Sequence, residues 1–296
     1  MREERDILLN QPARSQCVVC NRDAWLRYVK GPAQYWECPG CGLLYQSPLP
    51  DSGEMQGFAE AEYSGGVYQE YVRARELKYA TFRTRVALIR HHALSGRLLD
   101  VGCACGYFID VALQAGYDAY GIEFSAEAIS QASSEARRRI FQGNVDQLQA
   151  GPGEQFDIIT AFDIIEHSLA PLQLLSQLYT LLRPGGCLVL TTPDSRHVLR
   201  FLMGERWPML QPLQHIFLFS RQSLRLALEQ VGLRVVTMQR ATKCLTLDYL
   251  AGQIEDHNSS LHRVYCTLSH FLPRTIRLRP FQVNIGEMLV LAVKST

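Results

Sequence analysis

Apolar runs typical of buried strands alternate with helical segments from residue 97 onward, and this alternation constrains the fold more than any other feature. Four strands are expected at Arg97–Val101, Tyr117–Phe124, Phe156–Phe162 and Gly186–Thr192. The segments between them have helical patterns, and Gly116 closes the first of these helices. This order predicts a parallel α/β sheet with helices on both faces, whose ligands bind at the carboxyl ends of the strands.

The loop after the first strand lies in LLDVGCACGYF, residues Leu98–Phe108, and indicates a nucleotide-like ligand. Gly102 and Gly106 are separated by three residues, whereas a dinucleotide fingerprint needs G-x-G-x-x-G. Asp100 would repel a pyrophosphate but suits an ammonium group. Glu123, at the end of the second strand, can accept both hydroxyls of a ribose, and each charged hydrogen bond contributes about 1.5–3 kcal/mol. A ribose and an ammonium without a phosphate indicate S-adenosylmethionine.

Several segments in register resemble the class I S-adenosylmethionine-dependent methyltransferases, in particular the branch related to ubiquinone and menaquinone biosynthesis. They are LLDVGCACGYF, GIEFS, FQGNVDQL, FDIITAFDIIEH and LRPGGCLVLTTPD, followed later by QHIFLFS and VNIGEMLVLAVK. The resemblance implies a Rossmann-like, doubly wound sheet of seven strands with the last strand antiparallel. Ala104 replaces a commoner glycine, which is a small-for-small change. The residues expected at the cofactor are Asp100, Gly102, Cys103, Gly106, Glu123, Phe124, Asn144, Val145, Asp163 and Tyr68.

Four cysteines near the start form two pairs, CVVC and CPGC, with seventeen residues between them. Two such pairs at this spacing are typical of a zinc ribbon, and the segment between them predicts two strands joined at Gly31-Pro32. Zinc held by Cys17, Cys20, Cys38 and Cys41 would have no open position, so a structural ion is expected. The alternatives are two unrelated thiol pairs or a redox pair. Cys103 and Cys105 are interpreted as small loop fillers.

Candidates for catalysis follow the strands expected at Phe156–Phe162 and Gly186–Thr192, and are Asp163, His167 and His215. A histidine pKa suits removal of a hydroxyl proton near neutral pH. His167 and its neighbour Glu166 could instead cap the following helix, and Asp163 is expected to orient the cofactor or the acceptor. Orientation alone supplies ~7–11 kcal/mol of a barrier, whereas a general base gives about 10²–10⁴-fold. The enzyme interpretation therefore does not depend on a base.

Three regions are expected along the chain: a zinc ribbon at 1–50, a linker with a lid helix at 51–95, and a methyltransferase domain at 96–296. The lid helix is expected from about Tyr68 to His91. A cap insertion is expected at about 241–282. From residue 257 to residue 286 the chain has no acidic residue but contains Arg263, Arg274, Arg277 and Arg279. This stretch could recognise an anionic acceptor or form a solvated cap.

The favoured function is methyl transfer to a small-molecule acceptor, a hydroxyl of a sugar, a lipid or a secondary-metabolite intermediate. The alternatives are a sugar C-methyltransferase, an RNA or protein methyltransferase, a non-catalytic cofactor-binding regulator, and a nicotinamide oxidoreductase. A formal net charge of +1 does not favour a nucleic-acid partner. No run reaches the ~18 apolar residues of a membrane span, and the start MREERD lacks a signal-peptide pattern, so a cytoplasmic protein is expected. A homo-oligomer is left open.

Overall fold

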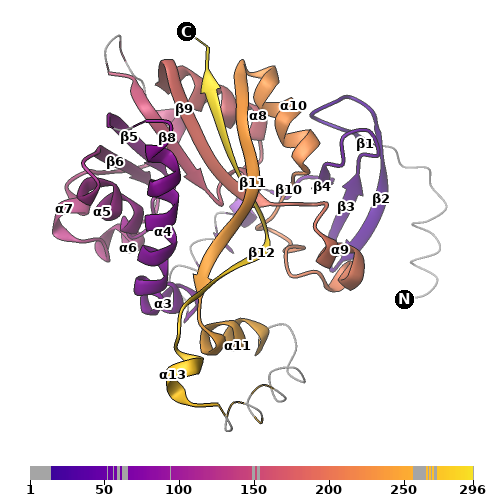
Figure 1. Ribbon diagram of the computed structural model, residues 1–296. Helices are drawn as coiled ribbons and strands as arrows, with labels where there is room; N and C mark the ends of the chain where they lie inside the picture. Colours follow the sequence, from indigo (N-terminus) through magenta and orange to yellow (C-terminus); the bar gives the residue numbers. More distant parts are fainter. Residues whose placement is uncertain are drawn as a thin grey trace.

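The larger of two β-sheets forms the centre of the molecule (Figure 1). The computed structural model describes residues 15–51, 53–55, 57–58, 61, 66–93, 95–148, 151, 154–255, 265, 267, 269 and 272–295. The sheet has seven strands in the order β11-β12-β9-β8-β5-β6-β7, and only β12 runs antiparallel to its neighbours. The predicted fold class is therefore confirmed. The strands are β5 (Arg97–Val101), β6 (Asp118–Glu123), β7 (Ile140–Gln142), β8 (Phe156–Phe162), β9 (Leu182–Pro193), β11 (Leu233–Leu245) and β12 (Phe281–Lys294).

Helices cover both faces of this sheet, each over its own apolar core. The core on one face includes buried side chains of α4 (Arg75–Arg90), α5 (Tyr107–Gln114) and α7 (Ser134–Arg137). The core on the other face includes side chains of α8 (Pro171–Leu181) and α10 (Arg221–Gln230). Figure 1 shows the two groups of helices on opposite sides of the sheet. Burial on both faces explains why the central strands are apolar throughout.

The single helix expected from Tyr68 to His91 is two helices, and that prediction was wrong. α3 (Gly66–Arg73) ends before Ala74, and α4 begins at Arg75. Alanine is the strongest helix former, so nothing in the local sequence marks the break. Ala74 is buried, and α3 lies beyond the end of α4, near the carboxyl ends of the parallel strands (Figure 1).

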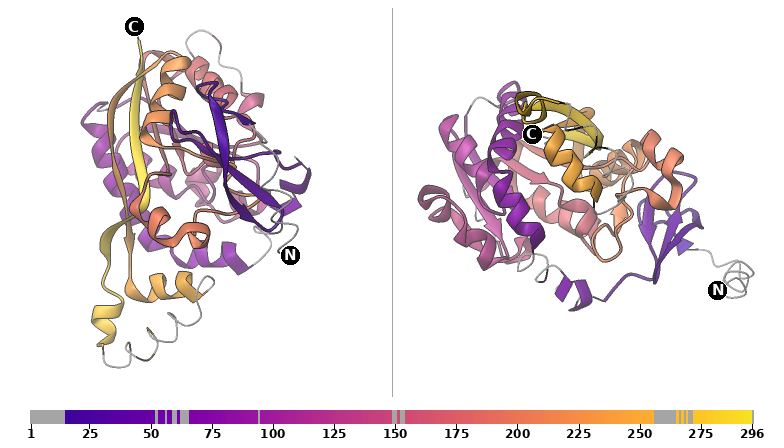
Figure 2. Two further views of the ribbon diagram at one scale, coloured as in Figure 1. Left: turned by 90° about the vertical axis from the view of Figure 1, so that its right-hand side faces the viewer. Right: turned by 90° about the horizontal axis from the view of Figure 1, so that it is seen from below.

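The smaller sheet joins the N-terminal segment to the rest of the chain. It consists of β1 (Ser15–Gln16), β2 (Asp23–Lys30), β3 (Ala33–Glu37), β4 (Leu44–Gln46) and β10 (Phe217–Leu218), all antiparallel. The strand, turn and strand expected between the cysteine pairs are β2, the turn at Gly31-Pro32 and β3. β10 comes from the segment between β9 and α10, and Figure 2 shows this sheet packed against one side of the molecule.

Side chains on both faces of the smaller sheet are buried. Because side chains alternate along a strand, neighbouring residues enter different cores. Trp36, Tyr45 and Phe217 belong to the core beneath α8 and α10. Tyr35, Leu44 and Leu218 pack with Trp207 and Leu210. The apolar core of the ribbon is thus continuous with that of the large sheet.

The remaining elements lie around the carboxyl ends of the parallel strands. The N-cap of α6 (Ala126–Ser130) is Ser125, whose Oγ accepts the Ala128 N–H at 3.2 Å. α11 (Leu247–Glu255) and α13 (Arg274–Arg277) lie beyond the sheet, at the bottom of Figure 1. Among the described residues, no helix has the length and hydropathy of a membrane span. The other helical segments are η1 (Val145–Gln147), η2 (Ile165–His167), α9 (Val198–Met203) and η3 (Gly204–Arg206).

Candidate functional site

The loop between β5 and α5 has a backbone that only small residues permit. Gly102 and Gly106 have φ values of +68° and +67°, a region that favours glycine. A Cβ on Gly102 would lie 2.1 Å from Cδ1 of Ile164. Ala104 also has a positive φ, +47°. This backbone turns tightly at the carboxyl end of β5 and leads into the first turn of α5.

Glu123 fixes that loop from the end of β6. Its two carboxylate oxygens accept the backbone N–H groups of Ala104 and Ser125, each at 2.9 Å. A carboxylate oxygen can accept more than one hydrogen bond, so these two bonds do not by themselves exclude a ribose hydroxyl. Phe124 is 41% exposed beside it. Asn144 and Val145 follow β7, the neighbouring strand, so the residues predicted for the ribose and the adenine lie along one edge region of the sheet.

Asp100 is a buried acid at the end of β5. Its Oδ1 accepts a hydrogen bond from Thr160 Oγ1 at 2.7 Å. Burial, with a smaller contribution from the nearby Glu123 carboxylate, raises the pKa of Asp100 to about 7, although the Thr160 hydrogen bond acts to lower it. A carboxyl group with such a pKa gains or loses its proton near neutral pH, and a cation placed beside it would favour the charged form.

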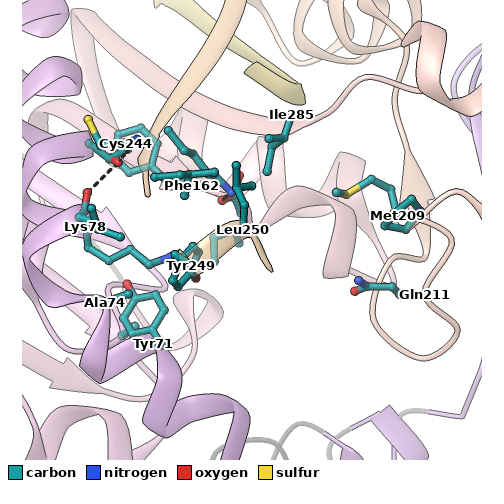
Figure 3. Close-up of a pocket in the computed structure, with 18 of the residues that line it drawn as sticks. Tyr71, Ala74, Lys78, Phe162, Met209, Gln211, Cys244, Tyr249, Leu250 and Ile285 are labelled. Carbon is teal, nitrogen blue, oxygen red and sulfur yellow. Dashed lines mark hydrogen bonds and ion pairs between the residues drawn. The ribbon is translucent and has the colours of Figure 1, made fainter. Parts of the chain in front are cut away.

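A cavity of about 990 Å³ opens beside Asp100 (Figure 3). Of the residues predicted at the cofactor, Asp100, Gly102, Cys103 and Asp163 line it. Gly106, Glu123, Phe124, Asn144 and Val145 do not line it and lie toward β6 and β7 instead. The side chain of Tyr68 is outside the described part of the chain, but Tyr71, one turn further along α3, lines the cavity.

The walls of the cavity come from segments far apart in the sequence. One wall belongs to α4 and includes Lys78 and Arg85; another belongs to β11 and α11 and includes Lys243 and Tyr249. The opposite wall is the segment from α9 to Gln211, with Met209 and Gln211 shown in Figure 3. Lys30, in the ribbon, also lines the cavity and donates a hydrogen bond to the Leu210 carbonyl at 2.6 Å. The ribbon therefore supports one side of the chamber.

Asp163 and Lys243 form an ion pair on the cavity wall. Lys243 Nζ lies 3.1 Å from Asp163 Oδ2 and also contacts the buried Glu287. Burial opposes ionisation of Asp163, but Lys243, Arg85 and the Thr191 hydroxyl outweigh it and hold its pKa below the usual value. Burial and Asp163 raise the pKa of Glu287. Asp163 has a φ of +57°, so its backbone turns sharply as β8 ends.

His167 and His215 lie together but away from the cavity surface. Their ring centroids are 5.1 Å apart, and their Nδ1 atoms face the carbonyls of Gln214 and Met209 at 2.9 and 2.8 Å. Ligand atoms of both rings and of Glu166 lie within 4.8 Å of one another. Burial lowers the pKa of both histidines, that of His215 to about 3. Neither ring lines the cavity, so their catalytic role stays a prediction.

The four predicted metal ligands form one cluster. The sulfurs of Cys17, Cys20, Cys38 and Cys41 all lie within 4.8 Å of one another. Cys17 and Cys41 have sulfurs 3.5 Å apart, and Cys20 and Cys38 have sulfurs 3.4 Å apart. Tetrahedral zinc with bonds of about 2.3 Å places its sulfurs about 3.8 Å apart. The donor type, the number of donors and their spacing fit one zinc ion.

Sequence reasoning missed the charged wall formed by Lys78, Arg85, Lys243 and Glu287. Glu287 carried a usable signal, because an acid within the apolar run of a predicted central strand must have a partner. Lys78 and Arg85 carried little signal, since charged residues on a helix are usually solvated.

Comparison with known proteins places the chain in a family. Residues 68–238, more than half of the chain, match the family model described as "Methyltransferase domain". The chain belongs to this family, as the sequence predicted.

Individual relatives share part of its length. It is 29% identical over 190 residues to a tRNA U34 carboxymethyltransferase of Idiomarina loihiensis, covering 56% of this chain and 58% of that protein. It is 32% identical over 103 residues to a ubiquinone biosynthesis O-methyltransferase of Psychrobacter arcticus, covering 32% of this chain and 40% of the relative. The chain thus spans about half the length of these curated relatives.

A solved structure confirms the fold. It is that of Burkholderia thailandensis 1,6-didemethyltoxoflavin-N1-methyltransferase with bound 1,6-didemethyltoxoflavin and S-adenosylhomocysteine. It aligns with a TM-score of 0.52 and 16% identity, over 92% of this chain and 99% of that one. At this identity the likeness concerns the fold alone.

Proposed function

We propose that this chain transfers a methyl group from S-adenosylmethionine to a hydroxyl of a small-molecule acceptor. The observation that carries the proposal is the cavity of about 990 Å³, which joins the end of β5 to a chamber walled by α4, α11 and the segment before β10. The chamber has room for an acceptor next to the residues assigned to the cofactor. The chamber is a cavity with a mostly apolar lining, not an open basic surface. This shape favours a small-molecule acceptor over RNA.

The cofactor is assigned to the carboxyl ends of β5, β6 and β7. Asp100 and Gly102 would hold its methionine end, Glu123 its ribose, and Asn144 and Val145 its adenine. When bound, S-adenosylmethionine supplies an electrophilic methyl group on a cationic sulfur. The buried acid Asp100 and the tight loop at Gly102 fit a cationic, phosphate-free ligand, because a pyrophosphate would be repelled by Asp100.

The residues of the cavity would act mainly by orientation. Asp163 is ionised and paired with Lys243, so it accepts a hydrogen bond from an acceptor hydroxyl more readily than it takes up a proton. The apolar and aromatic side chains around it, such as Phe162, exclude water from the path of the methyl group. Holding two reactants in line can supply ~7–11 kcal/mol of the barrier.

Zinc is assigned to the four-cysteine cluster, with no open position for chemistry. The spacing of the four sulfurs supports this assignment. The role of the metal would be to hold the ribbon that supports the cavity wall at Leu210.

Binding of S-adenosylmethionine in competition with NAD tests the proposal most directly. Native mass spectrometry of the purified chain is expected to show one zinc ion and preferential retention of S-adenosylmethionine or its demethylated product. Retention of NAD instead would overturn the assignment. An affinity for RNA that falls steeply with salt would favour the RNA methyltransferase alternative, consistent with the name of the Idiomarina relative.

Glu123→Ala is expected to weaken S-adenosylmethionine binding at least tenfold. It removes the acceptor for the ribose and also leaves the N–H groups of Ala104 and Ser125 without their bonds. Isothermal titration calorimetry measures the effect, with Glu127→Ala on the exposed side of α6 as the control. Unchanged affinity in Glu123→Ala would exclude the ribose assignment.

The affinity for S-adenosylmethionine is expected to rise with pH up to about pH 7 and then level off. The folded pKa of Asp100, about 7, is above the unfolded value of about 3.9. This group therefore stabilises the cofactor-free fold most at low pH and loses that contribution as pH rises through 7. A cationic cofactor needs the ionised form, so each pH unit below 7 costs up to about tenfold in affinity. In Asp100→Asn, calorimetry should show a flat profile; a slope that persists would place the titrating group elsewhere.

A further inference from the structure

Two cations of α4 line the cavity: Lys78, which is partly buried, and Arg85, which is buried. Lys78 and Arg85 lie seven residues apart on α4, on one face of the helix, and both line the cavity. Arg85 is 4% exposed, and its Nη1 has no hydrogen-bond partner. Within the described residues, neither side chain makes an ion pair within 4 Å. Burying a charge without a direct counter-ion is costly, above all for Arg85, so the two cations indicate that a further group binds here.

Aromatic rings hold both cations in place. Lys78 Nζ lies 4.3 Å from the centroid of the Tyr71 ring, and the Arg85 guanidinium lies 5.2 Å from that of Phe162. Figure 3 shows the Lys78 side chain extending from α4 across the cavity toward Tyr249. Ring contacts of this kind stabilise a cation but do not neutralise its charge.

The charges around this wall do not balance. The groups that face Lys78 and Arg85 are Asp163, Lys243 and Glu287. Both acids of this set are already bound by Lys243. Within this set, three cations face two carboxylates, so the set carries one excess positive charge. Burial and the nearby Lys243 lower the pKa of Lys78 to about 8, which is consistent with an ammonium group that lacks an anion.

This wall shares the cavity with Asp100 and Gly102 but extends from them toward the other edge of the sheet. Those residues follow β5, β6 and β7, on one half of the sheet. Lys243 belongs to β11 at the opposite edge, and the Cys244 N–H donates to Thr81 Oγ1 at 2.8 Å, which fastens α4 to β11. The unpaired cations thus lie between the cofactor half and the β11 edge, where an acceptor would enter.

We propose that Lys78 and Arg85 form a subsite for an oxyanion of the methyl acceptor, such as a carboxylate. This inference rests on the proposed function and narrows its substrate class to anionic molecules. A guanidinium presents parallel N–H groups that match the two oxygens of a carboxylate, and an ammonium group adds a point charge. Arg263 of the predicted cap lies outside the described residues. Its other arginines are less suited, because Arg277 pairs with Asp248 and Arg274 and Arg279 are exposed.

Paired ligands that differ only in charge test the subsite. The full chain, loaded with S-adenosylhomocysteine, is titrated by calorimetry with 3,4-dihydroxybenzoate and 3,4-dihydroxybenzamide, then with hexanoate and hexanamide. At least one carboxylate is expected to bind about tenfold or more tightly than its amide, the discrimination typical of a buried charged pair. In Lys78→Met this preference should fall to nearly one. Arg90→Met, at an exposed position on the same helix, should keep it.

Two controls separate the subsite from a loss of fold and from a cofactor contact. Lys78→Met removes a partly buried charge that has no direct ion pair, so the variant should fold with unchanged or higher thermal stability. A lost preference is then not a lost fold. A second arm compares S-adenosylhomocysteine with its decarboxylated analogue. If Lys78→Met abolishes the discrimination between these two, the cations hold the cofactor's own carboxylate and the proposal is overturned. The proposal is also overturned if each amide binds as tightly as its carboxylate, or if none of the four ligands binds. Failure of S-adenosylhomocysteine itself to bind would instead contradict the proposed function.

Discussion

Cys41→Ser, or removal of zinc by a chelator, is expected to unfold the ribbon and the cavity wall that the ribbon supports. Structural zinc contributes about 10–16 kcal/mol in small zinc domains, so a ribbon without it should not stay folded. Both cysteine pairs are bound to the large domain: the Cys41 carbonyl accepts a hydrogen bond from Ser220, and the Val19 carbonyl accepts one from Gln230. The loss should therefore reach beyond the ribbon itself.

The measurement follows metal content, circular dichroism and tryptophan fluorescence through thermal unfolding. Trp207 packs against Tyr35 and Leu44 of the ribbon, so its emission should shift to that of an exposed indole as the ribbon unfolds. Cys187→Ala, which changes a buried thiol in β9, should retain the metal. A Cys41→Ser variant whose large sheet melts at the wild-type temperature would show that the ribbon is an independent appendage.

Local sequence patterns predicted the fold because each pattern describes one element and its neighbour. The alternation of strands and helices implies a parallel sheet, and the cysteine spacing implies a ribbon. Both inferences hold whatever the remaining side chains are. β10 could not be predicted in this way. It has two residues, Phe217 and Leu218, and becomes a strand only because β4 offers an unpaired edge. The joining of the two sheets is therefore a tertiary property.

The candidate site also has a part that the sequence predicts and a part that depends on tertiary contacts. Asp100 and Glu123 each end a strand, so the topology of a parallel sheet brings them to one region. The charged wall depends on pairs far apart in the chain, such as Asp163 and Lys243, separated by 80 residues. Periodicity reports only which face of a helix is buried, and a lysine or arginine on that face is usually assigned to solvent. Lys78 and Arg85 are recognisable only once α4 is placed against β11.

The weakest prediction from the sequence was the catalytic role of the two histidines. His167 and His215 do come together, although 48 residues separate them by number. Their contacts with the Gln214 and Met209 carbonyls instead connect η2 to the segment that forms a cavity wall. The sequence can therefore indicate that a histidine lies near the predicted active site. Whether its ring points into the cavity depends on the conformation of the loop that follows β9.

Lys243→Met is expected to destabilise the fold by about 3 kcal/mol at neutral pH. Removing one partner of a buried ion pair costs about 3–5 kcal/mol, and the lower end applies because Asp163 is 36% exposed. The variant leaves Glu287 buried beside Asp163 without its hydrogen-bonded cation, and only the more distant Arg85 still favours its charged form. The pKa of Glu287 then rises further above the unfolded value. A group with a raised folded pKa stabilises the fold at low pH and loses that effect as pH rises. The cost of Lys243→Met should therefore shrink toward about pH 4, where both folded and unfolded Glu287 are protonated.

Urea unfolding of the wild type and the variant, at acidic and at neutral pH, measures this difference. Adding Glu287→Gln to Lys243→Met should recover most of the lost stability, because the amide needs no counter-charge. Lys294→Met is a suitable control, since Lys294 donates hydrogen bonds to the backbone carbonyls of Tyr179 and Leu182. A cost that is equal at both pH values, with no rescue by Glu287→Gln, would mean that Lys243 acts by packing rather than by charge. Asp163 and Glu287 would then not be neutralised by Lys243 and could balance the charges of Lys78 and Arg85. The proposed subsite for an anionic acceptor would lose its electrostatic argument.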